Sequence, residues 1–378
     1  VTSEGRAIDL PTSITASYTF RQIEHQAATL FSHGCGRTHG TLMNFVGARI
    51  QQELHKFPED QRYDAARVMY GMTNCTKCQC GEDLSLISAD NFGSLIKIPG
   101  GSIGIPLGFV GVLAPLLRDL PECAIKYCRA VENIRWGSNC PTGGPRAIVT
   151  CYGGEEYQAD YVLITVSLGV LKKMGNRLFC PALPAEKTDA INNLGYGYVN
   201  KIFLEYCRPW REGGIKLAWS PHELADRSDW VKGLCSIAEL PGNEYVLGAW
   251  VGGPEALNVE KCSDEEIAES ITRLLRQFTG DPSLPYPSNV LRSKWCSDPY
   301  FHGSYSYLGV KSTVGHQRDL GMPVPGLCEN ISPILLFAGE ATCPGHYSTV
   351  HGARLSGIRE AERIVQITKR YRRPPPKF

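Results

Sequence analysis

The stretch ILLFAGEATCPGHYSTVHGARLSG, residues 334–357, decides the fold class. It begins with five apolar residues, 334–338, which are typical of a short buried strand. Gly339 follows, and a segment with the apolar spacing of a helix begins near Thr349. This order presents backbone N–H groups and the positive end of a helix dipole to an electron-rich ligand. We therefore expect an α/β fold with a ligand near residues 339–352, although an ordinary strand-to-helix connection has the same pattern.

Earlier segments of the sequence also predict strands and helices. Residues 161–166 form a nearly continuous apolar run, as expected of a strand that is buried on both faces. Residues 263–280 predict a helix, because Ser263 and Glu266 fit a capping box and Gly280 fits a C-terminal stop. Further strands are expected at residues 202–206 and 245–250, and helical stretches at residues 48–54 and 64–69.

Composition excludes several classes of protein. The 378 residues carry 39 basic against 38 acidic side chains, and this balance does not favour nucleic-acid binding. The sequence has no apolar run of eighteen residues, so no membrane span and no membrane partner are expected.

Cysteines are numerous, and free buried thiols are the favoured interpretation of the 15 that occur. Cys75, Cys78 and Cys80 could supply three zinc ligands, with Cys35 or His39 as a fourth. A zinc site usually has a second paired motif, which is missing from the sequence, so we expect no metal.

Five segments, in order along the chain, resemble the flavin-containing amine oxidase family, which includes monoamine oxidases and histone lysine demethylases. Two of them, 194–205 and 295–307, closely resemble the spermine oxidase and acetylpolyamine oxidase branch, and the resemblance covers residues 90–370. The five segments are 98–101 with 131–136, 160–171, 194–205, 295–307, and 336–342 with 348–357.

The resemblance implies an α/β architecture in which an FAD-binding domain is interleaved with an α+β substrate domain of mixed sheet and flanking helices. The FAD-binding domain is expected to be partial, because the family's Gly-x-Gly-x-x-Gly turn is missing from these residues. Without an initiator Met, the sequence is expected to begin within a longer protein. The expected divisions are 1–94 (helical part of the substrate domain), 95–178 (middle FAD segment), 179–287 (substrate sheet), 288–372 (C-terminal FAD segment) and 373–378 (tail).

The resemblance also implies a role for single residues. Lys201 would be the catalytic residue, holding a water against the flavin, although a lysine at a strand edge is more often a surface residue. Tyr305, Ser348 and Thr349 would face the substrate, although aromatic residues such as Tyr305 are more often part of a core. The residues that would bind the cofactor are Val131, Trp295, Gly339, Glu340, Thr349 and Val350.

The implied activity is the FAD-dependent oxidation of spermine or acetylated polyamines to an aldehyde and a shorter amine, with oxygen reduced to hydrogen peroxide. The alternative is a catalytically inactive binding module, because the loop that cradles the pyrophosphate is missing. The substrate carboxylate of the polyamine enzymes aligns near Asn74, which leaves the polyamine open. We expect a cytoplasmic monomer, or a peroxisomal one if the C-terminal residues 376–378 act as an address.

Overall fold

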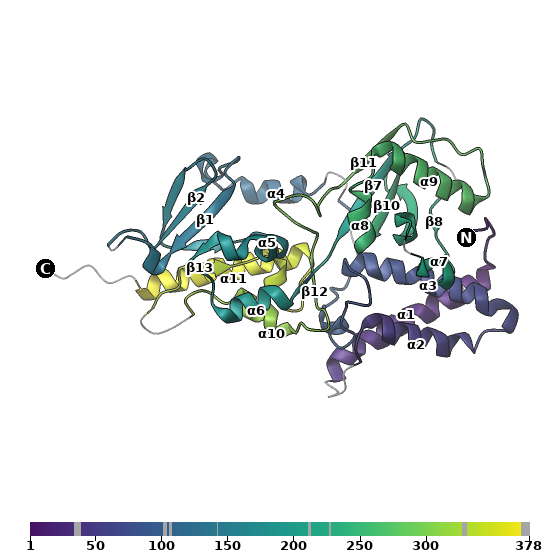
Figure 1. Cartoon of the computed structure of the whole chain (residues 1–378), viewed down its shortest axis with the longest axis horizontal. Coiled ribbons are helices and arrows are strands. Elements are labelled where there is room, and N and C mark those ends of the chain that lie inside the picture. The colour runs from purple at the N-terminus through teal and green to yellow at the C-terminus, as the bar shows by residue number, and fades with distance from the viewer. Residues whose placement is uncertain are drawn as a thin grey trace.

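The computed structural model describes residues 1–33, 39–100, 104–105, 108–141, 143–210, 213–226, 228–326 and 331–371. These residues form two lobes, each built from segments that are far apart in sequence (Figure 1). The first lobe combines N-terminal helices with strands from the middle of the chain, and the second combines an earlier middle segment with the C-terminal helix (Figure 1). The C-terminal tail and Cys35 lie outside the described residues.

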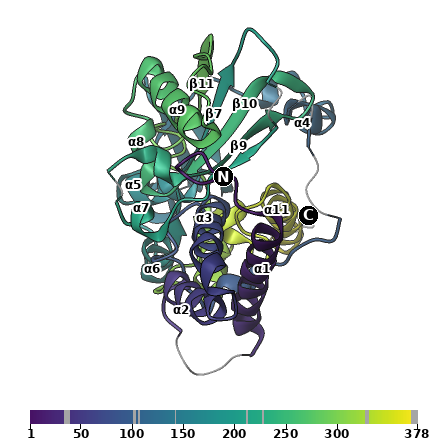
Figure 2. The same cartoon turned by 90° about the vertical axis from the view of Figure 1, so that its right-hand side faces the viewer.

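Three long helices form one part of the first lobe and enclose a core around Phe20, Ile50 and Met69. They gather below the sheet of this lobe, while two later helices lie beside it (Figure 2). The predicted helical stretches 48–54 and 64–69 are confirmed inside the second and third helices. The helices of the lobe are α1 (Leu10–His33), α2 (Leu42–Leu54), α3 (Arg62–Cys80), α7 (Pro221–Ala225), α8 (Pro254–Val259) and α9 (Asp264–Thr279).

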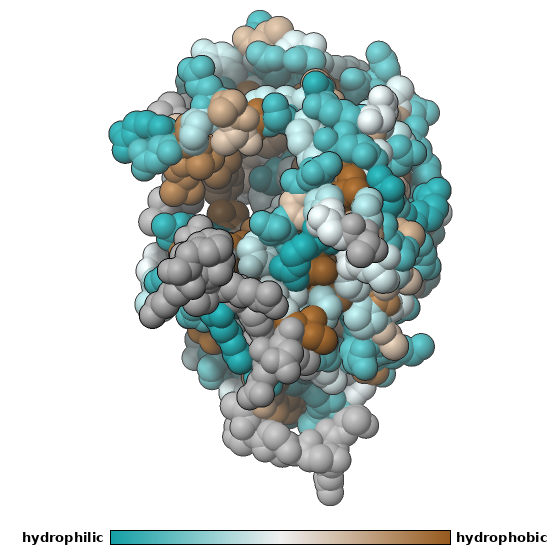
Figure 3. Space-filling view, turned by 90° about the vertical axis from the view of Figure 1, so that its left-hand side faces the viewer, coloured by the Kyte–Doolittle hydropathy of each residue, from teal (hydrophilic) through white to brown (hydrophobic). Residues whose placement is uncertain are grey.

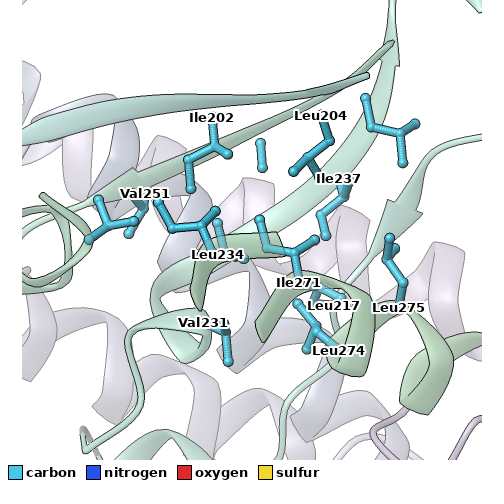
Figure 4. Close-up of a cluster of buried hydrophobic side chains, with 14 of the residues drawn as sticks. Ile202, Leu204, Leu217, Val231, Leu234, Ile237, Val251, Ile271, Leu274 and Leu275 are labelled. Atoms are coloured by element: carbon cyan, nitrogen blue, oxygen red, sulfur yellow. The ribbon is translucent and has the colours of Figure 1, made fainter. Parts of the chain in front are cut away.

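The sheet of the first lobe has five antiparallel strands in the order β11-β7-β10-β9-β8. Helix α9 packs its apolar face onto this sheet, so that Ile271 and Leu274 meet Ile202 and Leu234 in a closed core (Figure 4). The predicted capping box and the left-handed Gly280 are both present on α9. The strands are β7 (Val199–Glu205), β8 (Ile215–Lys216), β9 (Leu234–Leu240), β10 (Asn243–Gly252) and β11 (Asn289–Arg292).

The second lobe holds a four-stranded sheet, β3-β2-β1-β5, and a separate parallel pair, β13-β4. Its strands are β1 (Val131–Trp136), β2 (Ala147–Cys151), β3 (Glu156–Ala159), β4 (Val162–Ile164), β5 (Phe179–Cys180) and β13 (Leu335–Phe337). Its helices are α4 (Val110–Leu117), α5 (Leu168–Leu178), α6 (Ala185–Asn193), α10 (Val314–Gly321) and α11 (Val350–Tyr371). The strand and helix expected in 334–357 are therefore confirmed as β13 and α11.

An apolar groove of about 820 Å³ opens on the second lobe, and it is lined by residues of β1, β4 and α5. The space-filling view onto this lobe shows apolar residues gathered around a hollow (Figure 3). The prediction that strand 161–166 is buried on both faces is wrong, because Leu163 is 37% exposed. The reason is that, within the described chain, only β13 pairs with β4, and the groove lies along it.

A short pair of strands, β6 (Gly195–Tyr196) and β12 (Ser306–Tyr307), connects the lobes (Figure 1). None of the helices in the described part of the chain is long and apolar enough to cross a membrane.

Candidate active site

Lys201 lies on β7, an interior strand of the five-stranded sheet, so it is not the exposed edge residue that its type alone suggests. The antiparallel register places Trp250 of β10 directly opposite Lys201. The Lys201 Nζ lies 4.3 Å from the centroid of the Trp250 ring and 5.9 Å from that of Trp295. Burial lowers the pKa of the Lys201 ammonium below its ordinary value, because a low-dielectric environment disfavours the charge. Trp250 is not among the site residues that the sequence predicts.

A buried polar network holds Trp295 beside the lysine. The Asn200 side chain, which is fully buried, accepts hydrogen bonds from the Ser293 hydroxyl at 2.8 Å and from the Trp295 backbone N–H at 3.4 Å. Its amide donates to Glu260 at 2.7 Å. The backbone N–H of Lys201 donates to the Ser293 hydroxyl at 2.9 Å. The strand with the lysine and the loop with the tryptophan are therefore fixed to each other by satisfied buried groups.

Glu340 lies at the C-terminal side of β13 and ties two loops together. Its carboxylate accepts hydrogen bonds from the Ser306 N–H at 3.0 Å, the Ser306 hydroxyl at 2.7 Å and the Ser348 N–H at 2.5 Å. Burial raises the pKa of the Glu340 carboxyl in spite of these hydrogen bonds, which favour its ionised form. Ser348 has a φ of +59° and its hydroxyl donates to the Ser306 carbonyl. A residue with this strained backbone conformation persists where several surrounding contacts hold it in place.

The start of α11 forms the other side of this corner. Thr349 caps the helix, because its hydroxyl accepts the Gly352 N–H at 3.0 Å. Gly339 has a φ of +133°, and its N–H donates to Ser356 of α11 at 2.8 Å. Val350, the first residue of the helix, is 58% exposed. The positive end of this helix therefore lies at accessible surface.

Two imidazole nitrogens nearby, His346 Nδ1 and His351 Nε2, are buried, and neither has a hydrogen-bond partner in the part of the chain that the structure describes. The two rings meet edge to face, with centroids 5.3 Å apart. Within the described chain, these two ring nitrogens are therefore hydrogen-bonding groups that the polypeptide does not satisfy.

Tyr305 connects the lysine strand to the α11 corner. Its carbonyl accepts the Gly197 N–H at 2.8 Å, two residues before β7 begins. Its hydroxyl donates to the Cys78 carbonyl at 2.5 Å, near the end of α3. A side chain at Gly81 would lie 2.8 Å from the Tyr305 ring, so this glycine allows the helix end to approach the ring closely. The Tyr305 ring is therefore held against α3.

Val131 does not join these groups. It lies in the apolar groove of the second lobe, with Val162 and Val166 among the other lining residues. The structure thus gathers the other site residues into two connected groups, one around Lys201 and one around Glu340, and leaves Val131 at a separate opening.

Asn74, which aligns near the substrate carboxylate of the polyamine enzymes, has a structural role here. Its amide donates to the carbonyls of Lys232 at 2.7 Å and Leu234 at 3.3 Å, so that it ties α3 to the start of β9. Among the described residues, Cys75, Cys78 and Cys80 are not part of any group of three side chains that could hold a metal ion.

The sequence model of the family described as "Flavin containing amine oxidoreductase" matches residues 75–365. The human peroxisomal N(1)-acetyl-spermine/spermidine oxidase is 35% identical over 356 residues, which are 89% of this chain and 70% of that protein. A probable polyamine oxidase of Arabidopsis thaliana is 34% identical over 308 residues, which are 72% of this chain and 56% of that protein.

Among solved structures, a putrescine oxidase variant redesigned in its cofactor binding has a TM-score of 0.65 at 17% identity, covering 96% of this chain and 78% of that one. This likeness confirms the predicted fold class, and the sequence matches confirm the resemblance to the polyamine oxidase branch. The chain therefore belongs to the flavin-containing amine oxidoreductase family and is an FAD-dependent amine oxidase.

Proposed function

We propose that the protein oxidises polyamines, either spermine or an acetylated polyamine, to an aldehyde and a shorter amine. The observation that supports this most is the half-buried Lys201 amine between two tryptophan rings, connected through the Tyr305 loop to the Glu340 corner. The relatives named as acetylpolyamine and polyamine oxidases support the substrate class.

The residues present fit one end of FAD. The open N-terminus of α11, the positive φ of Gly339 and the orphaned imidazole nitrogens provide a polar corner, which the hydrogen bonds of Glu340 to Ser306 join to the Tyr305 loop. We assign the flavin end to Trp295, Glu340, Gly339, Thr349 and Val350. At the nucleotide end, we assign the adenine contact to Val131, at the apolar groove. The 378 residues have no Gly-x-Gly-x-x-Gly turn to cradle the pyrophosphate.

When bound, FAD would supply the hydride acceptor for the carbon next to the amine nitrogen and the means of reducing oxygen to hydrogen peroxide. The residues of this chain position the substrate and control its solvent. Lys201, with its lowered pKa, is neutral more readily than an exposed lysine, so it can hold a water without repelling a cationic amine. The rings of Trp250, Trp295 and Tyr305 offer apolar and π contacts to an aliphatic amine and exclude other water.

The rival function is an inactive binding module. The observation that favours it is the open groove along β4, where the second lobe leaves apolar side chains in contact with solvent. In that case the family resemblance describes the fold and not the activity.

The deciding experiment measures peroxide release from the purified protein, supplied with FAD, on spermine, N1-acetylspermine and a monoamine such as benzylamine. We expect bound flavin absorbance and peroxide release with a polyamine. Release with the monoamine alone would overturn the substrate class. Bound flavin without turnover of any amine would favour the binding module.

Two further measurements test the remaining expectations. Sedimentation of the purified protein would test the proposed monomer. Imaging of the tagged protein in cells would test the cytoplasmic location against the peroxisomal one.

A further inference from the structure

A group of three thiols lies away from the lysine site, where α3 crosses β9. Cys75 and Cys78 are one turn apart on α3, and Cys235 is the second residue of β9. A hydrogen bond of 3.3 Å from the Asn74 amide to the Leu234 carbonyl fixes the helix to the strand at the residues immediately before Cys75 and Cys235. The two elements are thus held together at the level of the thiols by an interaction that does not involve sulfur.

Two glycines allow α3 to come this close to the sheet. A Cβ at Gly71 would lie 2.7 Å from the Leu217 carbonyl oxygen, and a Cβ at Gly252 would lie 2.9 Å from the Cys78 Cα. Both positions therefore require the absence of a side chain, and the backbone contact that results brings the helix thiols to the strand.

The three thiols have different surroundings. Cys78 is buried, and its thiol donates to the Trp250 carbonyl at 3.7 Å. Cys75 and Cys235 are half-buried, and both line a cavity of about 260 Å³ that is also lined by Lys216. A small reagent that enters this cavity therefore meets Cys75 and Cys235 together, and it does not meet Cys78.

The electrostatics of the group distinguish Cys235 from Cys75. The neighbouring Cys75 thiol lowers the pKa of the Cys235 thiol, and the ammonium of Lys216 acts in the same direction. The same interaction, together with burial, raises the pKa of Cys75. The two shifts run in opposite directions, so Cys235 loses its proton more readily than Cys75, as a reactive cysteine does beside a resolving one.

We propose that Cys75 and Cys235 form a reversible redox site, in which a peroxide converts the two thiols into a disulfide that joins α3 to β9. The Cys235 thiolate attacks one oxygen of hydrogen peroxide, the O–O bond breaks, and hydroxide leaves to give a sulfenic acid at Cys235. The Cys75 sulfur loses its proton, attacks the Cys235 sulfur and displaces the second hydroxide. In total, two thiol protons and two electrons pass to one peroxide, one S–S bond forms, and two waters result.

This site is close to the candidate active site along the helix. The Cys78 carbonyl, one turn after Cys75, accepts the Tyr305 hydroxyl, and Trp250, which receives the Cys78 thiol, lies over the Lys201 amine. A bond between Cys75 and Cys235 therefore constrains the helix segment against which Tyr305 rests. The proposal does not depend on the proposed oxidase activity, because the peroxide in the test is added.

The sequence allows a direct test by peptide mapping. Trypsin cleaves after Lys77, which separates Cys75, in residues 68–77, from Cys78, in residues 78–97. Cys235 is the only cysteine in residues 233–261. The protein is treated with limiting hydrogen peroxide, the remaining thiols are alkylated under denaturing conditions, and the digest is analysed by mass spectrometry.

We expect a cross-linked species of residues 68–77 with 233–261 that disappears after treatment with dithiothreitol. In Cys235→Ser, the loss of free Cys75 in peroxide should slow at least tenfold. In the matched control Cys207→Ser, which removes an exposed thiol elsewhere, it should stay within twofold of the parent rate.

Three results would overturn the proposal: Cys235 recovered only as sulfinic or sulfonic acid, Cys235 linked to the peptide of Cys78, or Cys75 fully alkylated after oxidation. The mapping of the unsubstituted protein decides between these results even if Cys235→Ser does not fold.

Discussion

The two lobes differ in how completely their apolar surfaces are covered. In the first lobe, α9 covers one continuous five-stranded sheet, and the residues at this contact, such as Ile271 and Leu234, are fully buried. In the second lobe the strands are divided between two sheets, and an apolar groove lies along β4. The lysine is thus positioned by a complete core, whereas the expected nucleotide end borders a surface that the described residues leave open. The half of the candidate site around Lys201 should consequently tolerate little change, and the half at the groove much more.

The largest effect is expected from Lys201→Met, which keeps the length and apolar stem of the side chain and removes the amine. If the neutral amine organises a water at the reacting centre, turnover of the preferred polyamine should fall by about 10²- to 10⁴-fold, the usual contribution of a positioned proton-transfer group. Peroxide release at saturating substrate measures this. The matched control is Lys172→Met, at a lysine of α5 whose pKa burial also lowers, and it should retain activity. Equal losses in both variants would remove Lys201 from its proposed role.

The next largest effect compares the two lobes directly. Ile271→Ala opens a cavity in the closed core and should lower the free energy of unfolding by about 2–5 kcal/mol. Leu163→Ala, at the groove, should cost less than about 1 kcal/mol, because its side chain already contacts solvent. Denaturant unfolding of both variants measures the difference. Similar costs would mean that the groove is filled in solution.

A smaller effect is expected from Lys187→Met within the second lobe. The Lys187 ammonium donates to the carbonyls of Asp319 at 2.8 Å and Leu320 at 2.7 Å and also to that of Met322, so it satisfies the end of α10. Methionine would leave these buried acceptors without a donor, at a cost of about 2 kcal/mol. Thermal unfolding measures this loss of stability. A variant as stable as the parent would show that water replaces the ammonium.

The smallest expected effect concerns pH and Glu340→Gln. Because burial raises the pKa of Glu340 in the folded state, its stabilising contribution is complete below its ordinary value of 4.5 and is lost as pH rises through the folded pKa. The parent should therefore lose stability relative to the glutamine variant as pH rises above 4.5. Unfolding curves at several pH values measure the slope. A difference that is independent of pH would show that the carboxyl keeps its ordinary pKa.

Much of the architecture follows from local sequence. The capping box of α9, the β13 turn and the start of α11 are each specified by residues within a few positions of one another, so that periodicity and capping chemistry predict them. The motifs, in their order along the chain, also predicted the family. Within the last of them, the Ser348 N–H donates to the Glu340 carboxylate. The β4 segment is where local reasoning failed, because an apolar run specifies a strand but does not specify how many neighbours cover it.

The sequence by itself determined the family and the elements that have local signals, such as β13, α9 and the start of α11. Only the tertiary structure decided that Trp250 faces Lys201, that Asn200 and Glu260 hold the Trp295 loop, and that Cys75 and Cys235 line the same cavity. The physical reason is strand register: a slip of one residue turns every side chain to the other face, and register depends on contacts between segments that are distant in the chain. Helix capping and turns use neighbouring residues, which the sequence shows directly, whereas the partners of a strand or a thiol are chosen by packing.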